Sequence, residues 1–154
     1  AYVFLETTTG EKDSLTQLYS RSTYEEYVKF LIEEKRAFQV MMIDLDGFKA
    51  INDNFGHHVG DRVLIDFANI LVSVFTNEKV ISRLAGDEFI IVIQNSTQED
   101  EAIIQDIVTL CKASQVEQIR TLQFSYGFQE YNENLSFDEL YIMVDNNMYL
   151  NKHS

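Results

Sequence analysis

The stretch RLAGDEF, Arg83 to Phe89, lies between two short apolar runs, Val80-Ile81 and Phe89 to Ile93. Apolar β-branched runs on either side of a Gly-Asp step predict a β-hairpin with a tight turn. This turn places two adjacent carboxylates, Asp87 and Glu88, at the start of the returning strand. Since successive strand residues point to opposite faces, only one of the two should share a face with a given ligand. Taken alone, such an acidic turn also fits an ordinary solvent-exposed loop.

A second acidic turn favours the functional interpretation. Asp44-Leu45-Asp46 also follows an apolar run, Phe38 to Ile43, which we expect to be a buried central strand that ends at Asp44. Two strand ends that each present carboxylates suit a hard divalent cation such as Mg²⁺. For Asp46 itself, a carboxylate that caps the turn is the simpler interpretation.

The bulk composition predicts one globular domain. A chain of 154 residues with 45% hydrophobic and 12% aromatic residues is long enough to bury a core and too apolar for disorder. Its 12 basic and 25 acidic residues give a net charge of −13. Such a surface repels polyanions, so we expect no nucleic-acid binding and no contact with anionic membranes. A single nucleotide can still bind where a metal ion and a few local donors outweigh this field.

The sequence also predicts a location. The single cysteine, Cys111, cannot form an internal disulfide, which fits a reducing compartment. No apolar run reaches the roughly 18 residues of a membrane helix, and no signal peptide is visible. We therefore expect a cytoplasmic domain. The full-length protein can still carry a membrane anchor, and we expect a sensor or regulatory domain upstream of Ala1.

Periodicity and capping signals predict an α+β fold. Capping-box spacing at Ser22 to Glu25 and at Ser136 to Glu139 predicts two helix starts. A break at Gly60, with Asp61 as the cap or the first residue of the next helix, predicts a longer helix after it. The remaining expected elements are a helix over 48–55, an acidic helix over 97–111 and a strand over 122–128. The resulting order predicts a mixed central β-sheet covered by helices, although it permits more than one topology.

Several segments resemble motifs of one known family, the GGDEF domains of diguanylate cyclases. Ala85 to Phe89 resembles the family signature, with Ala85 where the first Gly usually stands. The other matching segments follow in family order: Asp13 to Arg21, Asp44 to Asp53, Phe55 to Asp61, Phe124 to Gly127 and Asp145 to Lys152. The resemblance implies a ferredoxin-like palm related to that of nucleotide cyclases and polymerases. It divides the chain into a connector, residues 1–12, and a GGDEF domain, residues 13–154.

The resemblance implies a site for Mg²⁺, with Mn²⁺ as an alternative ion. Its expected ligands are the side chains of Asp44 and Asp87 and the backbone carbonyl of Leu45, while Glu88 is a candidate ligand of a second ion. Mg²⁺ commonly takes one or two protein carboxylates and completes its shell with water and phosphate oxygens. Asp87 and Glu88 are accordingly the expected catalytic residues. A role of Asp87 as proton acceptor fits less well, because an ionised metal ligand is a poor base.

Asn52 and Asp61 resemble the guanine-binding pair of the family. A carboxylate suits the N1–H and N2–H₂ donors of guanine, whereas adenine would leave that carboxylate unpaired. His57 lies in the same segment and resembles a substrate contact. Taken alone, Asn52 could as well be a helix cap, Asp61 an ordinary residue of the first helical turn and His57 a structural histidine.

The triphosphate is expected to meet lysines and an open turn. Lys49 and Lys152 resemble the phosphate-contacting lysines of the family, although either could be a surface lysine. Small residues at Ala85 and Gly86 leave backbone N–H groups accessible to phosphate oxygens. If position 85 requires a positive φ, Ala85 would weaken substrate binding.

Two positions bear on regulation. The inhibitory product site of the family is an Arg-x-x-Asp motif that ends five residues before the signature, and here those positions hold Thr76 and Lys79. Without a guanidinium and a carboxylate, this site is not expected to bind cyclic di-GMP.

Two hypotheses about function remain open. The first is a diguanylate cyclase, in which two chains face each other as a homodimer and condense two GTP into cyclic di-GMP and two pyrophosphates. The second is a catalytically weak GTP-binding module that regulates an attached or partner domain, which the variant residue Ala85 favours. A palm-type nuclease fits the acidic residues but leaves Asn52 and Asp61 unexplained.

Overall fold

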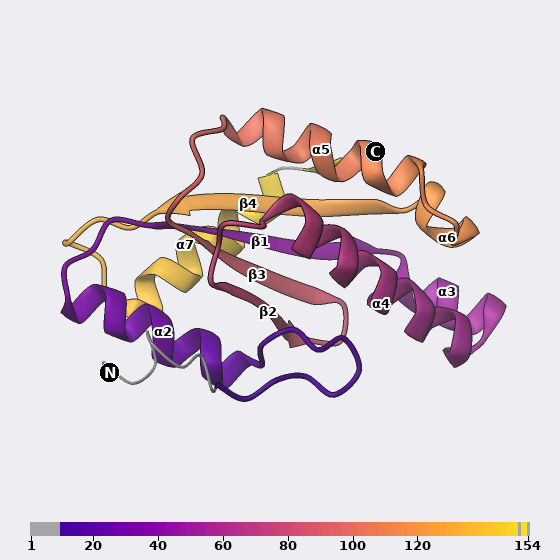
Figure 1. Cartoon of the computed structure of the whole chain (residues 1–154), viewed down its shortest axis with the longest axis horizontal. Coiled ribbons are helices and arrows are strands. Elements are labelled where there is room, and N and C mark those ends of the chain that lie inside the picture. Colours follow the sequence, from indigo (N-terminus) through magenta and orange to yellow (C-terminus); the bar gives the residue numbers. More distant parts are fainter. Residues whose placement is uncertain (1–9, 151, 154) are drawn as a thin grey trace.

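The computed structural model describes residues 10–150, 152 and 153. Helices on both faces enclose a five-stranded sheet with the strand order β2-β3-β1-β4-β5 (Figure 1). The strands are β1 (Gln39–Asp46), β2 (Val80–Ala85), β3 (Glu88–Ile93), β4 (Gln123–Glu130) and β5 (Lys152–His153). The helices are α2 (Arg21–Glu33), α3 (Phe48–Phe55), α4 (His57–Val74), α5 (Asp100–Lys112), α6 (Glu117–Arg120) and α7 (Phe137–Leu150).

The predicted α+β class and the predicted order of the main elements are confirmed, and α6 and β5 are additional short elements. The paired strands β2–β3, β3–β1, β1–β4 and β4–β5 are all antiparallel. Within the described part of the chain, the parallel component of the expected mixed sheet is limited to an isolated bridge between Tyr19 and Ser82. Most of the expected connector, residues 1–12, lies outside the described residues.

The central strand β1 separates two apolar cores. Met41, Ile43 and Leu45 contribute to the core formed with α4, α5 and α6. Val40 and Met42 contribute to the core formed with α2 and α7. This alternation follows from the two-residue period of a strand, and burial on both faces explains why the run from 40 to 43 is apolar throughout. The strand ends are therefore held rigidly, which is what a site built on them requires.

Several element boundaries differ from the predictions. β1 continues to Asp46 rather than ending at Asp44, because Leu45 and Asp46 remain paired with β4. α4 begins at His57, not at Asp61, because Gly56 (φ +88°) ends α3 and precedes the first turn of α4. The helix expected from residue 97 begins at Asp100.

The two predicted capping boxes had different outcomes. At α7 the box is confirmed: Glu139 N–H donates to Ser136 Oγ (3.1 Å), and Ser136 N–H donates to Glu139 Oε1 (2.9 Å). At α2 the prediction was wrong, because the helix begins at Arg21 and its N-cap is Ser20. Ser22 therefore lies inside the first turn, where its hydroxyl lies 2.9 Å from that of Ser20.

No helix in the described ranges is both long enough and apolar enough to cross a membrane.

Candidate active site

The register of the sheet places four of the expected site residues, Ala85, Glu88, Asp44 and Lys152, in one row. Glu88 pairs with Ala85 on one side and with Asp44 on the other, Asp44 pairs with Ser125, and Ser125 pairs with Lys152. Directly opposed residues of neighbouring strands lie on the same face of a sheet. The row therefore runs across all five strands at the edge that carries the signature turn.

A backbone hydrogen bond joins the two acidic turns. The N–H of Leu45 donates to the carbonyl oxygen of Asp87 (3.2 Å), so the signature turn is fastened to the end of β1. The carboxyl groups of Asp44 and Asp87 are also close enough that, besides burial, the negative charge of Asp87 raises the pKa of Asp44. Asp44 and Asp87, which are 43 residues apart in sequence, therefore lie close together in the fold.

The electrostatics of this pair favour a bound cation. Burial, followed by the negative charges of Asp87 and Glu88, raises the pKa of Asp44 to about 7. Burial and the charge of Asp87 also raise the pKa of Glu88, and Asp145 on α7 adds to that effect. Crowded carboxylates resist ionisation, and a divalent cation would relieve their repulsion.

The donor set fits Mg²⁺ better than a softer metal. In the described part of the chain, no group of three or more His, Cys, Asp or Glu side chains is arranged to hold a metal ion. Two carboxylates and the carbonyl of Leu45 would leave the remaining positions to water and phosphate oxygens, as Mg²⁺ commonly prefers. The pair Asp44 and Asp87 would hold such an ion.

The signature turn contains two residues, Gly86 and Asp87, between β2 and β3. Gly86 adopts φ +43°, a left-handed conformation that glycine tolerates without a steric penalty. Ala85 precedes it in β2. The described non-glycine residues with positive φ are Gln17 and Lys35, so the methyl group of Ala85 imposes no backbone strain. Both Ala85 and Gly86 are exposed.

The expected guanine pair lies where α3 meets α4. Asn52 is half-buried on α3, and its side chain lies against Gly60 in the first turn of α4, so a Cβ atom at position 60 would overlap Oδ1 of Asn52. Asp61 is the next residue and is exposed. Gly60 was expected to break the chain, and that prediction was wrong: it lies within α4 and provides room for Asn52.

The other expected substrate contacts are less defined. Lys49 is 93% exposed on α3, and its Nζ lies 3.7 Å from Oδ2 of Asp53, a surface pair of little energetic weight. His57 is exposed at the start of α4. Lys152 is placed by its backbone pairing with Ser125, in the same row as Asp44.

Asp46 does not have the expected role of capping the turn. Its Oδ1 accepts a hydrogen bond from Ser125 Oγ (2.8 Å), which links β1 to β4. Its Oδ2 is buried and has no hydrogen-bond partner among the described residues. The negative charge of Asp46 contributes to the raised pKa of Asp44, so this residue belongs to the acidic edge.

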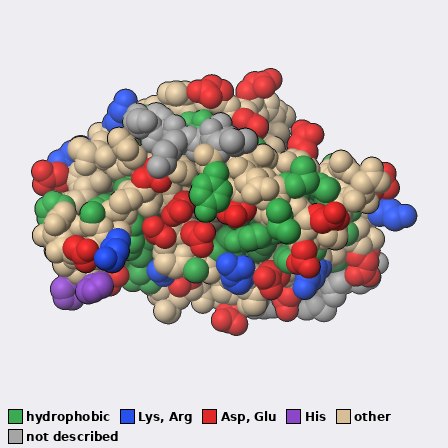
Figure 2. Space-filling view, turned by 180° about the vertical axis from the view of Figure 1, so that it is seen from behind, with side chains coloured by type: hydrophobic (Ala, Val, Ile, Leu, Met, Phe, Trp, Pro, Cys, Tyr) green, Lys and Arg blue, Asp and Glu red, His purple; other side chains and the backbone are tan. Residues whose placement is uncertain are grey.

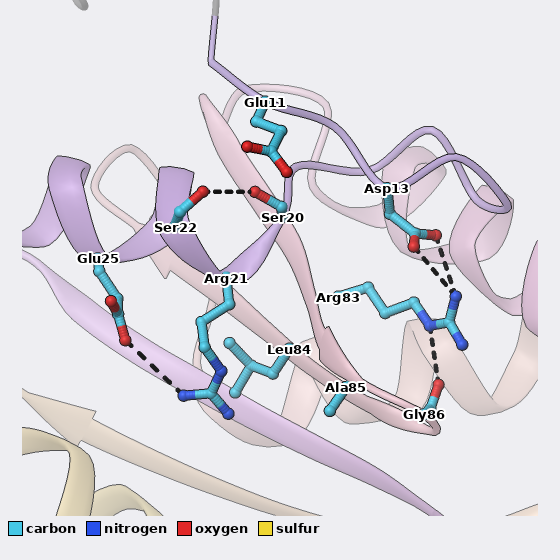
Figure 3. A pocket seen from close by; sticks show the side chains of 10 residues that line it. All are labelled: Glu11, Asp13, Ser20, Arg21, Ser22, Glu25, Arg83, Leu84, Ala85 and Gly86. Carbon is cyan, nitrogen blue, oxygen red and sulfur yellow. Dashed lines mark hydrogen bonds and ion pairs between the residues drawn. The ribbon is translucent and has the colours of Figure 1, made fainter.

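Sequence reasoning missed a set of side chains beside the signature turn. A cavity of about 560 Å³ lies between the segment before α2, the start of α2 and the turn itself (Figure 3). Asp13, Arg21 and Arg83 line this cavity. Arg21 lies over the ring of Tyr141, and its positive charge opposes the rise in the pKa of Glu88. Asp13 begins one matching motif and Arg83 lies two residues before another, but 70 residues separate them, and no local pattern predicts their contact.

Fold and site together define an α+β domain with an acidic edge at its signature turn. A sequence profile of the family described as "Diguanylate cyclase, GGDEF domain" matches residues 11–154. The chain therefore belongs to the GGDEF domain family, as the resemblance predicted.

Curated relatives agree with this membership. The chain is 38% identical over 98 residues to the bifunctional diguanylate cyclase/cyclic di-GMP phosphodiesterase MucR of Pseudomonas aeruginosa, a match that covers 61% of this chain and 14% of MucR. It is 28% identical over 146 residues to the diguanylate cyclase DgcS of Shewanella oneidensis, with 92% of this chain and 49% of DgcS covered. The chain thus spans half or less of the length of these relatives.

A solved structure has the same fold. The diguanylate cyclase SiaD of Pseudomonas aeruginosa, crystallised with its activator SiaC, superposes with a TM-score of 0.79 at 23% sequence identity. The superposition covers 90% of this chain and 56% of the SiaD chain.

Proposed function

We propose that this chain is a diguanylate cyclase domain that condenses two GTP into cyclic di-GMP with release of two pyrophosphates. The meeting of Asp44 with Asp87 at the ends of β1 and the signature turn carries this proposal. Phosphoryl transfer depends mainly on positioning and charge stabilisation, which this acidic edge can supply together with a metal ion. Bound there, Mg²⁺ would neutralise phosphate charge and help to align the attacking hydroxyl.

The remaining residues of the site have distinct roles in the proposal. Asn52 and Asp61 recognise the guanine edge, with His57 beside them at the start of α4. Lys49 and Lys152 offset the charge of the triphosphate, and the exposed turn at Ala85 and Gly86 admits its oxygens. Glu88 is the candidate ligand for a second ion, because it lies opposite Asp44 in the sheet.

The reaction as proposed requires two chains. Each domain holds one GTP, so the 3′-hydroxyl of one nucleotide must meet the α-phosphate of another held by a second copy. We infer that the active form is a homodimer and that regions outside this chain regulate it. SiaD, which has the same fold, was crystallised with an activator, and this gives one precedent for control by a partner.

The region of the inhibitory motif supports an absence of feedback inhibition. Thr76 and Lys79 replace its Arg and Asp, and both are exposed. Between them, Glu78 accepts hydrogen bonds from the N–H groups of Gln94 (2.7 Å) and Asn95 (3.0 Å). Asn95 Nδ2 donates in turn to the carbonyl of Asn77 (2.9 Å). The single carboxylate of this segment is therefore engaged with the backbone rather than presented to a ligand.

Incubation of the chain with GTP and Mg²⁺ at high protein concentration, followed by nucleotide analysis, tests the proposed activity. Cyclic di-GMP that disappears in Asp87→Asn, but not in the matched surface variant Asp106→Asn on α5, would support it. Bound but unconverted GTP, even with dimerisation enforced by a fused dimerising segment, would instead support the regulatory GTP-binding module.

A further inference from the structure

The segment before α2 is joined to the outer edge of β2. Tyr19 N–H donates to the carbonyl of Ile81 (3.1 Å), and Arg83 N–H donates to the carbonyl of Tyr19 (2.9 Å). These bonds form the parallel bridge between Tyr19 and Ser82. Figure 1 shows this segment running beside the β2–β3 hairpin. The strand that leads into the signature turn is thus held from outside by residues that precede α2.

Asp13 is held within this segment by hydrogen bonds with Thr16 and Leu18. Its Oδ2 accepts hydrogen bonds from the N–H (2.8 Å) and the hydroxyl (2.7 Å) of Thr16. Its own N–H donates to the carbonyl of Leu18 (2.7 Å). Burial alone would raise the pKa of Asp13, but the hydrogen bonds from Thr16 and the contact with Arg83 lower it overall. The carboxylate is therefore ionised at neutral pH and is engaged by Thr16 and Arg83.

Arg83 connects Asp13 to the signature turn. Its Nη1 lies 3.1 Å from each carboxylate oxygen of Asp13, and its Nε donates to the carbonyl of Gly86 (2.8 Å) (Figure 3). The side chains of Arg83 and Asp13 are only 17% and 22% exposed. A guanidinium is planar and rigid, so two contacts at fixed angles determine where the Gly86 carbonyl lies.

The turn needs such support because its own ladder is irregular. The register of β2 against β3 shifts between Arg83 and Ala85, which is the behaviour of a β-bulge. Bulges disrupt ladder hydrogen bonds and re-aim the following side chains. Gly86 is also the left-handed residue of the turn, and Asp87 follows it directly.

We propose that Arg83 is a positioning residue: by joining Asp13 to the carbonyl of Gly86, it sets the orientation of Asp87 toward Asp44. The effect of Arg83 on catalysis rests on the proposed cyclase function. Its effect on the geometry of the turn does not depend on that function. The residues before α2 thereby become part of the active edge.

Arg83→Lys is the informative substitution. Lysine keeps the positive charge beside Asp13 but cannot contact Asp13 and the Gly86 carbonyl at once with the rigid fork of a guanidinium. A misplacement of about 1 Å can lower a rate by about 100-fold. We expect kcat to fall about 10- to 100-fold, with KM for GTP within about threefold of wild type and little change in Tm. Amide hydrogen exchange at positions 86–88 should accelerate.

Two further variants separate a positioning role from a purely structural one. Asp13→Asn removes the ionic contact but leaves the Arg83–Gly86 bond, so its kcat should lie between those of wild type and Arg83→Lys. Arg36→Lys serves as the matched control, because Arg36 lies over the ring of Phe30, at the other end of α2 from Arg21. It should leave kcat and exchange unchanged.

Hydrogen exchange keeps the positioning proposal testable without activity. If wild type makes no cyclic di-GMP, the proposed function fails, but faster exchange at 86–88 in Arg83→Lys would still support the positioning role. If Arg83→Lys retains wild-type exchange and wild-type kcat, the positioning role is overturned. If Arg83→Lys lowers Tm but leaves amide hydrogen exchange at positions 86–88 unchanged, the Asp13–Arg83 ion pair only stabilises the fold. That result would also overturn the positioning role.

Discussion

At the residue scale, Asp44 is the site residue whose pKa departs most from its ordinary value. Its environment includes three other acidic side chains, Asp46, Asp87 and Glu88, and burial adds to their effect on its pKa. Such crowding has a cost in the metal-free protein, since like charges at short range oppose folding. Natural sites retain arrangements of this kind where function requires them.

The effect of this crowding on the stability of the folded protein should depend on pH. The pKa of Asp44 is raised from 3.8 to about 7, so the folded state binds the proton more tightly than the unfolded state. Its contribution to stability is therefore complete below about pH 4 and is lost as the pH rises toward 7. In metal-free protein, Asp44→Asn should match wild type at pH 4. At pH 8 it should be more stable by about 1 kcal/mol, or about 2–4 °C in Tm.

Thermal unfolding of metal-free protein across this pH range checks the prediction. Asp106→Asn is the control, because Asp106 is exposed on α5, and its Tm difference from wild type should not change with pH. Excess Mg²⁺ should stabilise wild type but not Asp44→Asn. An Asp44→Asn variant that is less stable than wild type at pH 8 without metal would show that the charges are not crowded.

At the element scale, the contact of α3 with α4 links folding to the proposed recognition of the nucleotide. Gly60→Ala should by helix propensity alone stabilise α4 by up to about 1 kcal/mol. The added methyl group would overlap the amide of Asn52, whose side chain can rotate away. We therefore expect stability to be nearly unchanged or slightly increased, while affinity for GTP falls about 10-fold or more because the proposed hydrogen bond between Asn52 and guanine is lost.

Calorimetric titration with GTP and thermal unfolding of the same sample measure both effects. Ala50→Gly on the exposed side of α3 is the control, since it should lower stability slightly and leave GTP affinity unchanged. Full GTP affinity in Gly60→Ala would mean that Asn52 does not contact the guanine.

The sequence was sufficient for the elements whose signals are local. The signature hairpin follows from two β-branched runs around Gly86-Asp87, and the start of α7 follows from the capping box at Ser136. The start of α4 was mislocated because Gly60 looks like a helix breaker, whereas its small size serves a contact with α3. The link between Asp13 and Arg83 was missed because it joins residues 70 positions apart and depends on the docking of residues 12–20 on β2.

At the scale of the whole molecule, charge opposes the proposed dimer. Each chain carries a net charge of −13, and acidic side chains are spread over the face shown in Figure 2. Two such chains repel one another at low ionic strength. At 0.1 M salt, the repulsion between exposed charges is largely screened beyond a distance of about 10 Å.

Activity should therefore depend on both protein concentration and salt. The rate per chain should rise with protein concentration, and raising NaCl from about 20 to 150 mM should shift this rise to lower concentrations. Initial rates of cyclic di-GMP formation over a range of protein concentrations, with sedimentation of the same samples, provide the measurement. A rate per chain that is independent of concentration while the protein sediments as a monomer would exclude reaction between two chains.

The central claim is that Asp44, near the end of β1, and Asp87, in the signature turn, hold one metal ion. Mn²⁺ binding followed by electron paramagnetic resonance, with GTP present, tests it in wild type, Asp44→Asn, Asp87→Asn and the double variant. If the two residues share one site, each single variant should weaken binding of the same Mn²⁺ ion by about 10-fold or more. The double variant should weaken that binding by less than the product of the two single effects. Unchanged Mn²⁺ binding in either single variant, or fully independent effects of the two, would contradict the claim.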